Sequence, residues 1–173
     1  MLHDRTVSNA DTRPRIRRAP LRATDPATVY RIMRLRTAVF VHEQGIVEEE
    51  ELDGRDLDPT TTLYWYENSD GAVLATLRLL GDEPIAHIGR VATATDARGR
   101  GLARELVRAA LADSSGPVEI SAQAHLENWY TALGFVTTGP GYLEAGIAHV
   151  PMRWTPPANG APDTGEGTAA DSR

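Results

Sequence analysis

Apolar positions along the chain recur with two different periods, which predicts a mixture of strands and helices. Short runs rich in β-branched and aromatic residues, bounded by turn residues, are typical of strands. Such runs predict strands over residues 16–21, 63–67, 72–80, 86–95, 118–122, 135–138 and 148–155. The second and third runs are separated by the sequence Asn-Ser-Asp-Gly, which favours a hairpin turn.

Other segments repeat apolar residues every three or four positions and predict helices over residues 27–41, 102–112 and 126–133. Asp25 is a typical N-cap for the first helix, and Pro26 fits its first position. The predicted order of elements is therefore β-α-β-β-β-α-β-α-β-β. We expect a mixed α/β fold with a mostly antiparallel sheet and flanking helices.

The length and the two ends of the chain predict a single domain with tails. A chain of 173 residues suits one domain with a substantial core. Residues 1–14 are polar without periodicity, and residues 156–173 are rich in Pro, Gly and Ala. Neither segment can bury enough apolar surface to offset the entropy of ordering it. We therefore predict one domain over residues 15–155 between two disordered tails.

The composition excludes several classes of site. The chain has no cysteine, so it forms no disulfides and offers no thiolate ligands, and we expect no metal site. All 18 basic residues are arginine, whereas an ordinary P-loop needs a lysine. The net charge of −6 argues against a general nucleic-acid partner. Because no apolar segment has the length of a membrane span or the pattern of a signal peptide, we expect a cytoplasmic protein without a membrane partner.

A predicted strand that runs into a glycine turn and then a helix is the most informative local pattern. The turn, residues 98–101, reads Arg-Gly-Arg-Gly. A helix N-terminus attracts anions because its first N–H groups have no partner within the helix and its dipole is positive there. Arg104 disfavours a dinucleotide-binding fingerprint, since that position calls for a small residue. A phosphate site and a helix start without any ligand are the other two interpretations.

Several blocks of the sequence resemble the GNAT superfamily of acyl-CoA N-acyltransferases. Residues 98–103 (RGRGLA) match its [QR]xxGx[GA] signature, and residues 124–135 (AHLENWYTALGF) resemble its helix with an aromatic-tyrosine pair before Leu-Gly-Phe. Residues 35–46 (LRTAVFVHEQGI) and 51–58 (ELDGRDLD) are similar to the ElaA-like branch, as is the closing sequence GIAHVPMRW. The resemblance extends over residues 16–154 and implies the GNAT fold, in which the two central strands splay apart.

The resemblance implies an N-acetyltransferase that moves the acetyl group of acetyl-CoA, its cosubstrate, to a primary amine of a small molecule or peptide. In the family, the pyrophosphate of coenzyme A binds backbone N–H groups of the glycine turn. The pantetheine arm pairs with the preceding strand, in the slot between strands that here are residues 86–95 and 118–122. The corresponding binding residues are Val91, Ala92, Thr93, Arg98, Gly99, Arg100, Gly101, Leu102 and Ala103.

The implied chemistry is a direct attack of the amine on the thioester, which needs a base for the ammonium and an acid for the leaving thiolate. Tyr130 matches the family's tyrosine before Leu-Gly-Phe and is the expected acid, with a purely packed aromatic beside Trp129 as the alternative. His87 is one candidate base, because histone-acetylating members carry a glutamate at the matching position and imidazole exchanges protons near neutral pH. Glu43, in the pattern FVHEQG, is its rival, and His42 is a third candidate.

A strongly acidic segment follows the first predicted helix. Residues 48–58 hold seven acids and one arginine, so their net charge of −6 equals that of the whole chain. Carboxylates beside an acceptor site would attract cationic amines, although many acidic loops are only solvated. The pattern around Asp53 and Asp56 also resembles the acidic motif of acyl-homoserine-lactone synthases, which share the fold.

Two further expectations concern function and assembly. A non-catalytic acyl-CoA-binding or partner-binding module on the same fold is the alternative to an enzyme. An exposed sheet edge near the C-terminus would allow two copies of the chain to pair as a homodimer.

Overall fold

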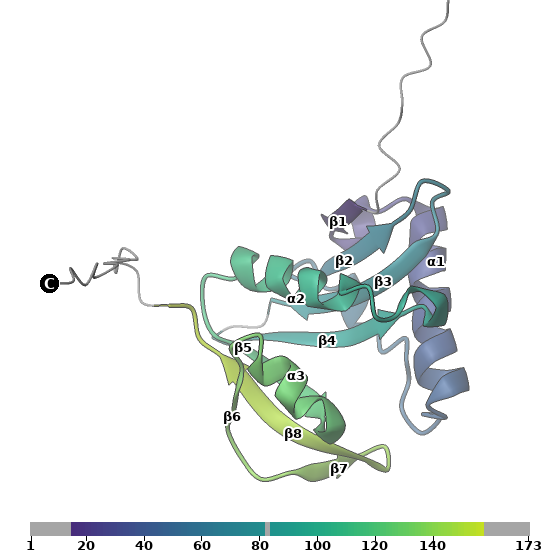
Figure 1. Cartoon of the computed structure of the whole chain (residues 1–173). Helices are drawn as coiled ribbons and strands as arrows, with labels where there is room; N and C mark the ends of the chain where they lie inside the picture. The colour runs from purple at the N-terminus through teal and green to yellow at the C-terminus, as the bar shows by residue number, and fades with distance from the viewer. Residues whose placement is uncertain (1–14, 82–83, 158–173) are drawn as a thin grey trace, which may run out of the picture.

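A computed structural model describes residues 15–81 and 84–157, and its centre is one eight-stranded sheet (Figure 1). The strand order is β1-β2-β3-β4-β5-β8-β6, and β7 pairs with β8 beside β6. The strands are β1 (Arg15–Ala19), β2 (Thr62–Glu67), β3 (Val73–Leu80), β4 (Ala86–Thr93), β5 (Val118–Gln123), β6 (Val136–Thr137), β7 (Tyr142–Glu144) and β8 (Ile147–Trp154). The helices are α1 (Pro26–Arg36), α2 (Leu102–Asp113) and α3 (Glu127–Thr131).

This architecture confirms the predicted fold class, with two local differences. The three-residue strand β7 was not predicted, because the glycines and proline around it are typical of a loop. The predicted helix over residues 27–41 ends as α-helix at Arg36 and continues as a π-helical turn, Thr37–Glu43. The predicted tail 1–14 and residues 158–173 lie outside the described residues, so the limits of the domain stay a prediction.

The sheet opens between its two central strands. All neighbouring strands are antiparallel except β4 and β5, which are parallel. Their pairing is confined to Ala86 opposite Val118 and His87 opposite Glu119. Beyond these pairs the strands separate, and the two halves of the sheet diverge in Figure 1. The predicted splay of the central strands is therefore confirmed.

Helices cover both faces of the first half of the sheet, so β2 is buried on both sides. In β2 the consecutive residues 63–66 are all buried, because successive side chains of a strand point to opposite faces. Leu63 and Trp65 pack with Ile32 and other residues of α1. Tyr64 and Tyr66 pack with residues of α2, which lies with α3 on the other face.

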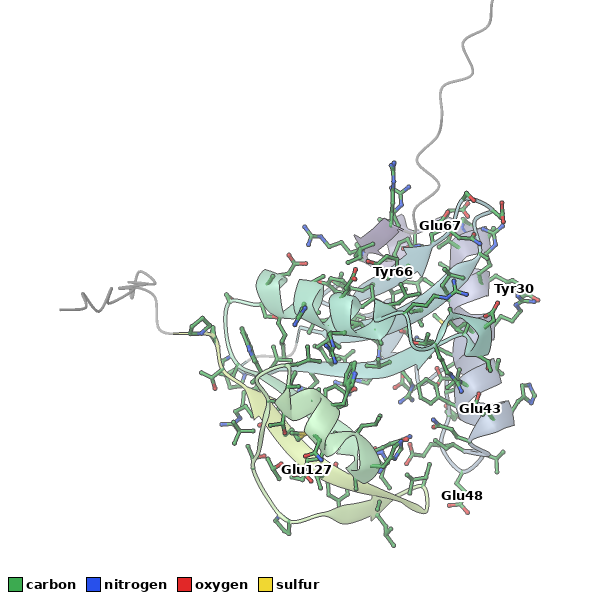
Figure 2. The ribbon with its side chains drawn as sticks, viewed as in Figure 1. Tyr30, Glu43, Glu48, Tyr66, Glu67 and Glu127 are labelled. Atoms are coloured by element: carbon green, nitrogen blue, oxygen red, sulfur yellow. The ribbon has the colours of Figure 1, made fainter. Side chains whose placement is uncertain are left out.

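The two tyrosines of β2 also hold α2 in place. The Tyr64 hydroxyl donates a hydrogen bond of 2.8 Å to Asp113 at the end of α2. The Tyr66 hydroxyl, labelled in Figure 2, donates to Glu105 in the first turn of the helix. Because both ends of α2 are bonded to one strand, the N-terminus of the helix has a fixed position relative to the opening in the sheet.

An arginine–carboxylate cluster at the C-terminal end of α1 holds part of the acidic segment. The guanidinium of Arg36, fully buried, contacts Glu51 and lies 2.8 Å from Asp56. Arg78 of β3 bonds Asp53 at 2.7 Å and Asp56 at 3.1 Å. Arg90 of β4 adds a contact of 2.8 Å to Glu51. Glu51 and Asp56 are therefore neutralised inside the fold. The other acids of the segment, Glu48, Glu49, Glu50, Asp53 and Asp58, are exposed.

Candidate functional site

A cavity of about 730 Å³ occupies the opening between β4, β5 and the N-terminus of α2. Its walls include most of the predicted coenzyme-binding residues: Val91, Ala92, Thr93, Arg98, Gly99, Gly101, Leu102 and Ala103. The side chain of Arg100 instead donates a hydrogen bond of 2.6 Å to the carbonyl oxygen of Asp96. The remaining predicted residues thus share one cavity although they come from a strand, a turn and a helix.

The glycine turn gives this cavity a wall made of backbone. Gly99 and Gly101 have φ angles of 74° and 79°, in the left-handed region that other residues rarely adopt. A Cβ atom at either glycine would meet no atom within 4 Å, so the turn needs glycine for its conformation and not for lack of space. Gly101 is also the N-cap of α2, which leaves the first N–H groups of the helix beside the cavity. This donor set fits a pyrophosphate.

Arg98 and Glu43 form an ion pair on the wall of the same cavity. The Arg98 guanidinium donates a hydrogen bond of 2.7 Å to the Glu43 carboxylate and a longer one, 3.3 Å, to the Thr93 carbonyl oxygen. Figure 2 shows Glu43 on the segment that continues from α1. The hydrogen bond from Arg98 lowers the pKa of Glu43 below its usual value. The π-helical turn that ends at Glu43 was not visible in the sequence pattern.

A β-bulge interrupts β4 beside the cavity. Arg78 of β3 pairs with Gly89, and Thr76 pairs with Ala92, so Arg90 and Val91 together oppose Leu77. Arg90 has a φ of 54°. This left-handed conformation is unfavourable for a residue with a side chain. Such bulges bend a strand and turn its backbone groups away from the regular ladder. The bulge thus lies where the pantetheine arm was predicted to pair with the strand.

A second, smaller cavity of about 310 Å³ adjoins the first. The residues that line both cavities are Gln44, Val91, Gln123, Leu126 and Tyr130. A hydrogen bond of 3.0 Å from Gln123 Nε2 to Gln44 Oε1 connects the segment after α1 to the end of β5 at this junction. A molecule in the first cavity and another in the second would therefore meet beside Tyr130.

Tyr130 is held in place by the packing of its ring. Its ring makes edge contacts with Trp129 and Phe135, at centroid distances of 4.7 and 5.7 Å. Only 6% of the residue is exposed, and within the described part of the chain its hydroxyl has no hydrogen-bond partner. Burial raises the pKa of Tyr130 to about 12. The phenol therefore keeps its proton at neutral pH while it borders both cavities.

The three candidate bases lie in different places. Glu43 lines the first cavity, and His87 lines the second. The His87 ring is 3.3 Å from Glu119, which also bonds Arg153. His42 is exposed and is absent from the walls of both cavities. The structure thus separates the candidate bases rather than gathering them in one place.

Two residues of the junction region had no role in the sequence analysis. Gln44 follows the π-helical turn, and its contact with β5 depends on a backbone conformation that periodicity cannot predict. His149 of β8 lines the second cavity and is 8% exposed. The only available signal for His149 was its place in the closing sequence GIAHVPMRW, where apolar neighbours favour a packed strand.

A splayed sheet, a glycine turn at a helix N-terminus and a buried tyrosine at the end of the slot define a class: acyl-CoA-dependent acyltransferases. The sequence matches the family model for the acetyltransferase (GNAT) domain over residues 32–156. The chain therefore belongs to the GNAT family, which confirms the resemblance and supports an acyl-CoA-dependent N-acyltransferase.

Individual relatives support the ElaA-like branch. UPF0039 protein Rv2851c of Mycobacterium tuberculosis is 44% identical over 142 residues, which are 79% of this chain and 90% of the relative. Protein ElaA of Escherichia coli is 35% identical over 132 residues, 72% of this chain and 85% of ElaA. A crystal structure of an acyl-CoA N-acyltransferase from Pseudomonas aeruginosa superposes with a TM-score of 0.77 at 36% identity. That superposition covers 83% of this chain and 100% of the other.

Proposed function

We propose that this protein transfers the acetyl group of acetyl-CoA to a primary amine of a small molecule or peptide. The observation that carries the proposal is the pair of cavities that meet at Tyr130. One has the backbone donors that suit a pyrophosphate, and the other leaves room for an acceptor. A cytoplasmic location and a homodimer are further parts of the proposal that rest on the sequence. Within residues 15–81 and 84–157, no helix is long and apolar enough to cross a membrane.

Coenzyme A would lie along the first cavity with its pyrophosphate at the glycine turn. The N–H groups after Gly101 would donate to phosphate oxygens, and the bulged backbone of β4 near Val91 would pair with the pantetheine amides. Arg98 would add positive charge, and its guanidinium would then be shared between the phosphates and Glu43. The thioester at the end of the arm would reach the junction beside Tyr130.

Tyr130 would act as the general acid. Attack of the amine nitrogen on the thioester carbon forms the C–N bond, and the C–S bond breaks as the phenol gives its proton to the departing sulfur. A phenol with a pKa raised to about 12 is protonated when this step begins. Acid assistance of this kind contributes about 10²–10⁴-fold to a rate.

Glu43 and His87 stay the candidate bases proposed from the sequence. The contacts of Glu43 and the strand position of His87 each weaken the case for that role. The lowered pKa of Glu43 makes its carboxylate a weaker proton acceptor, and Arg98 occupies it. His87 is paired at the level of Glu119, four residues before Gln123 on β5. At about 3.3 Å per strand residue, this places His87 roughly 13 Å along the strand from the junction.

Coenzyme binding provides the first test of the function. Because the glycine turn and α2 present donors for the pyrophosphate, acetyl-CoA is expected to raise the melting temperature in a thermal-shift titration. No stabilisation at millimolar acetyl-CoA or coenzyme A would contradict the proposal.

Turnover separates an enzyme from the alternative, a non-catalytic acyl-CoA-binding module. Tyr130→Phe is expected to lower kcat by about 10²–10⁴-fold, with the Kd of coenzyme A unchanged. Tyr30→Phe is the matched control, because Tyr30 is 68% exposed on α1 and is absent from both cavity walls. A wild-type protein that binds acetyl-CoA but releases no thiol with any amine of a broad panel would support the binding module.

A further inference from the structure

We propose that His149 is the general base that takes the proton from the acceptor amine. The inference rests on the proposed acetyl transfer and assigns a residue that the sequence did not single out. His149 lies on β8, lines the second cavity, and is buried except for 8% of its surface. A histidine in the wall of the acceptor cavity is placed to contact the amine rather than the coenzyme.

The hydrogen bonding of the ring fixes which nitrogen can accept a proton. His149 Nδ1 lies 2.8 Å from the carbonyl oxygen of Ile147, two residues earlier on the same strand. A carbonyl oxygen only accepts, so Nδ1 carries the hydrogen and the neutral ring keeps its lone pair on Nε2. Within the described residues Nε2 has no hydrogen-bond partner. Unlike the Glu43 carboxylate, which Arg98 occupies, this nitrogen is available to an amine.

The position of His149 along the sheet matches the junction of the cavities. His149 pairs directly with Gln123 across β5 and β8. Side chains of such a pair lie on the same face with Cβ atoms about 4.5–5.5 Å apart. Gln123 itself lines both cavities together with Tyr130. His149 is therefore at the level where the thioester would end, whereas His87 is at the level of Glu119.

Charged and titratable groups surround His149 on two sides. Glu144 of β7 has a carboxylate oxygen 4.0 Å from Nδ1, and the same oxygen accepts a hydrogen bond of 2.5 Å from the Ser121 hydroxyl. The Tyr142 ring, also on β7, stacks on the imidazole at a centroid distance of 6.1 Å. The other charged or titratable residues lining the same cavity are Glu49, Arg55, Arg78, His87, Arg90 and Tyr130.

The protons balance with two groups in these roles. An ammonium gives one proton to His149 Nε2, and the ring later passes it to solvent. The free amine attacks the thioester carbon, so that the C–N bond forms and the C–S bond breaks. Tyr130 protonates the sulfur and recovers a proton from the nitrogen that becomes the amide. The products are the acetylated amine, coenzyme A as a thiol and one released proton.

The pH dependence of kcat/KM tests this assignment, with acetyl-CoA and the best acceptor from a panel of primary amines and dipeptides. In wild type, the rate is expected to fall at acid pH as Nε2 becomes protonated. His149→Gln is expected to lose this acidic limb and about 10²–10⁴-fold of the rate at neutral pH. Its Kd for coenzyme A should stay that of wild type. His87→Ala, Glu43→Gln and His42→Gln should each keep the limb.

A second variant distinguishes a base from a residue that only supports the fold. Glu144→Gln keeps the size of the side chain, removes the carboxylate nearest the ring and leaves His149 Nε2 in place, so it should keep the acidic limb that His149→Gln loses. Glu48→Gln is the matched control, because Glu48 is exposed and lines neither cavity. Glu144→Gln keeps the assignment of His149 open to contradiction even if His149→Gln folds poorly.

The outcomes separate this inference from the proposed function. An active His149→Gln protein that keeps the acidic limb would overturn the assignment of His149 and leave acetyl transfer intact. The same holds if Glu144→Gln, which keeps His149, loses the limb. A wild-type protein that binds acetyl-CoA but acetylates no amine of the panel would overturn both proposals.

Discussion

At the scale of single residues, the site depends on side chains whose hydrogen-bonding groups are left available by their surroundings. Tyr130 is packed between two aromatic rings, yet its hydroxyl has no partner within the described chain. His149 uses one ring nitrogen within its own strand and leaves the other available. Sequence comparison predicted Tyr130 from the residues that follow it. It gave His149 no role, because the position of His149 beside the cavities depends on its pairing with Gln123 of another strand.

The raised pKa of Tyr130 predicts that kcat stays level to high pH. A general acid works in its protonated form, and burial moves the pKa of Tyr130 from an ordinary value of 10.0 to about 12. The fraction of protein with a protonated phenol therefore persists to higher pH than for an exposed tyrosine. We expect kcat, measured at saturating acetyl-CoA and amine and corrected for spontaneous thioester hydrolysis, to stay level up to about pH 11. A decline centred at pH 10 or below would contradict the raised pKa.

The ion pair between Glu43 and Arg98 predicts an effect on binding that is independent of turnover. The carboxylate occupies Arg98 and would repel a pyrophosphate at the glycine turn. Because the pair is exposed and screened by salt, its influence is modest. Glu43→Gln should tighten the binding of coenzyme A by about two- to fivefold at low salt, and isothermal titration calorimetry can measure the change. Weaker binding would mean that Glu43 itself helps to hold the coenzyme.

At the scale of elements, regular periodicity was predictable and its interruptions were not. The glycine turn and α2 appear in the sequence as a strand signal, two glycines and a helical repeat. The bulge at Arg90 and the π-helical turn before Gln44 each depend on one extra residue in an otherwise regular element. Propensities of neighbouring residues carry almost no information about such insertions. These two irregular segments nevertheless supply residues of both cavities.

The turn itself predicts a loss of binding that arises from backbone strain alone. At Gly101, a Cβ atom has open space but the φ of 79° is unfavourable for other residues. A left-handed conformation costs about 1–2 kcal/mol for a residue with a side chain. If the altered turn relaxes in the free protein, Gly101→Ala should weaken coenzyme A binding by about 5–30-fold.

Gly116→Ala provides the comparison for that experiment. A Cβ atom at Gly116 would also have open space around it, and the φ of this glycine lies outside the left-handed region. Calorimetric binding to Gly116→Ala should therefore match wild type. Equal binding to both variants would show that the left-handed turn does not shape the coenzyme site.

At the scale of the whole molecule, the acidic segment joins the helix on one face to strands at the centre of the sheet. Arg36 belongs to α1, Arg78 to β3 and Arg90 to β4, and the carboxylates between them come from residues 51–56. Local sequence showed only the excess of negative charge. The neutralising arginines are 15 or more residues away in the chain, so their contacts follow from the tertiary fold. The cluster fixes the segment that borders the second cavity.

This arrangement makes Asp56 the most sensitive carboxylate of the cluster. Asp56 is 5% exposed and bonds both Arg36 and Arg78, whose guanidinium groups are also buried. Removing one partner of a buried ion pair leaves an uncompensated charge, which typically costs about 3–5 kcal/mol. Asp56→Asn should lower the free energy of unfolding by about that amount in urea titrations. Asp70→Asn, in the exposed hairpin turn, should change it by less than about 0.5 kcal/mol. A similarly small change for Asp56→Asn would show that the cluster contributes little to stability.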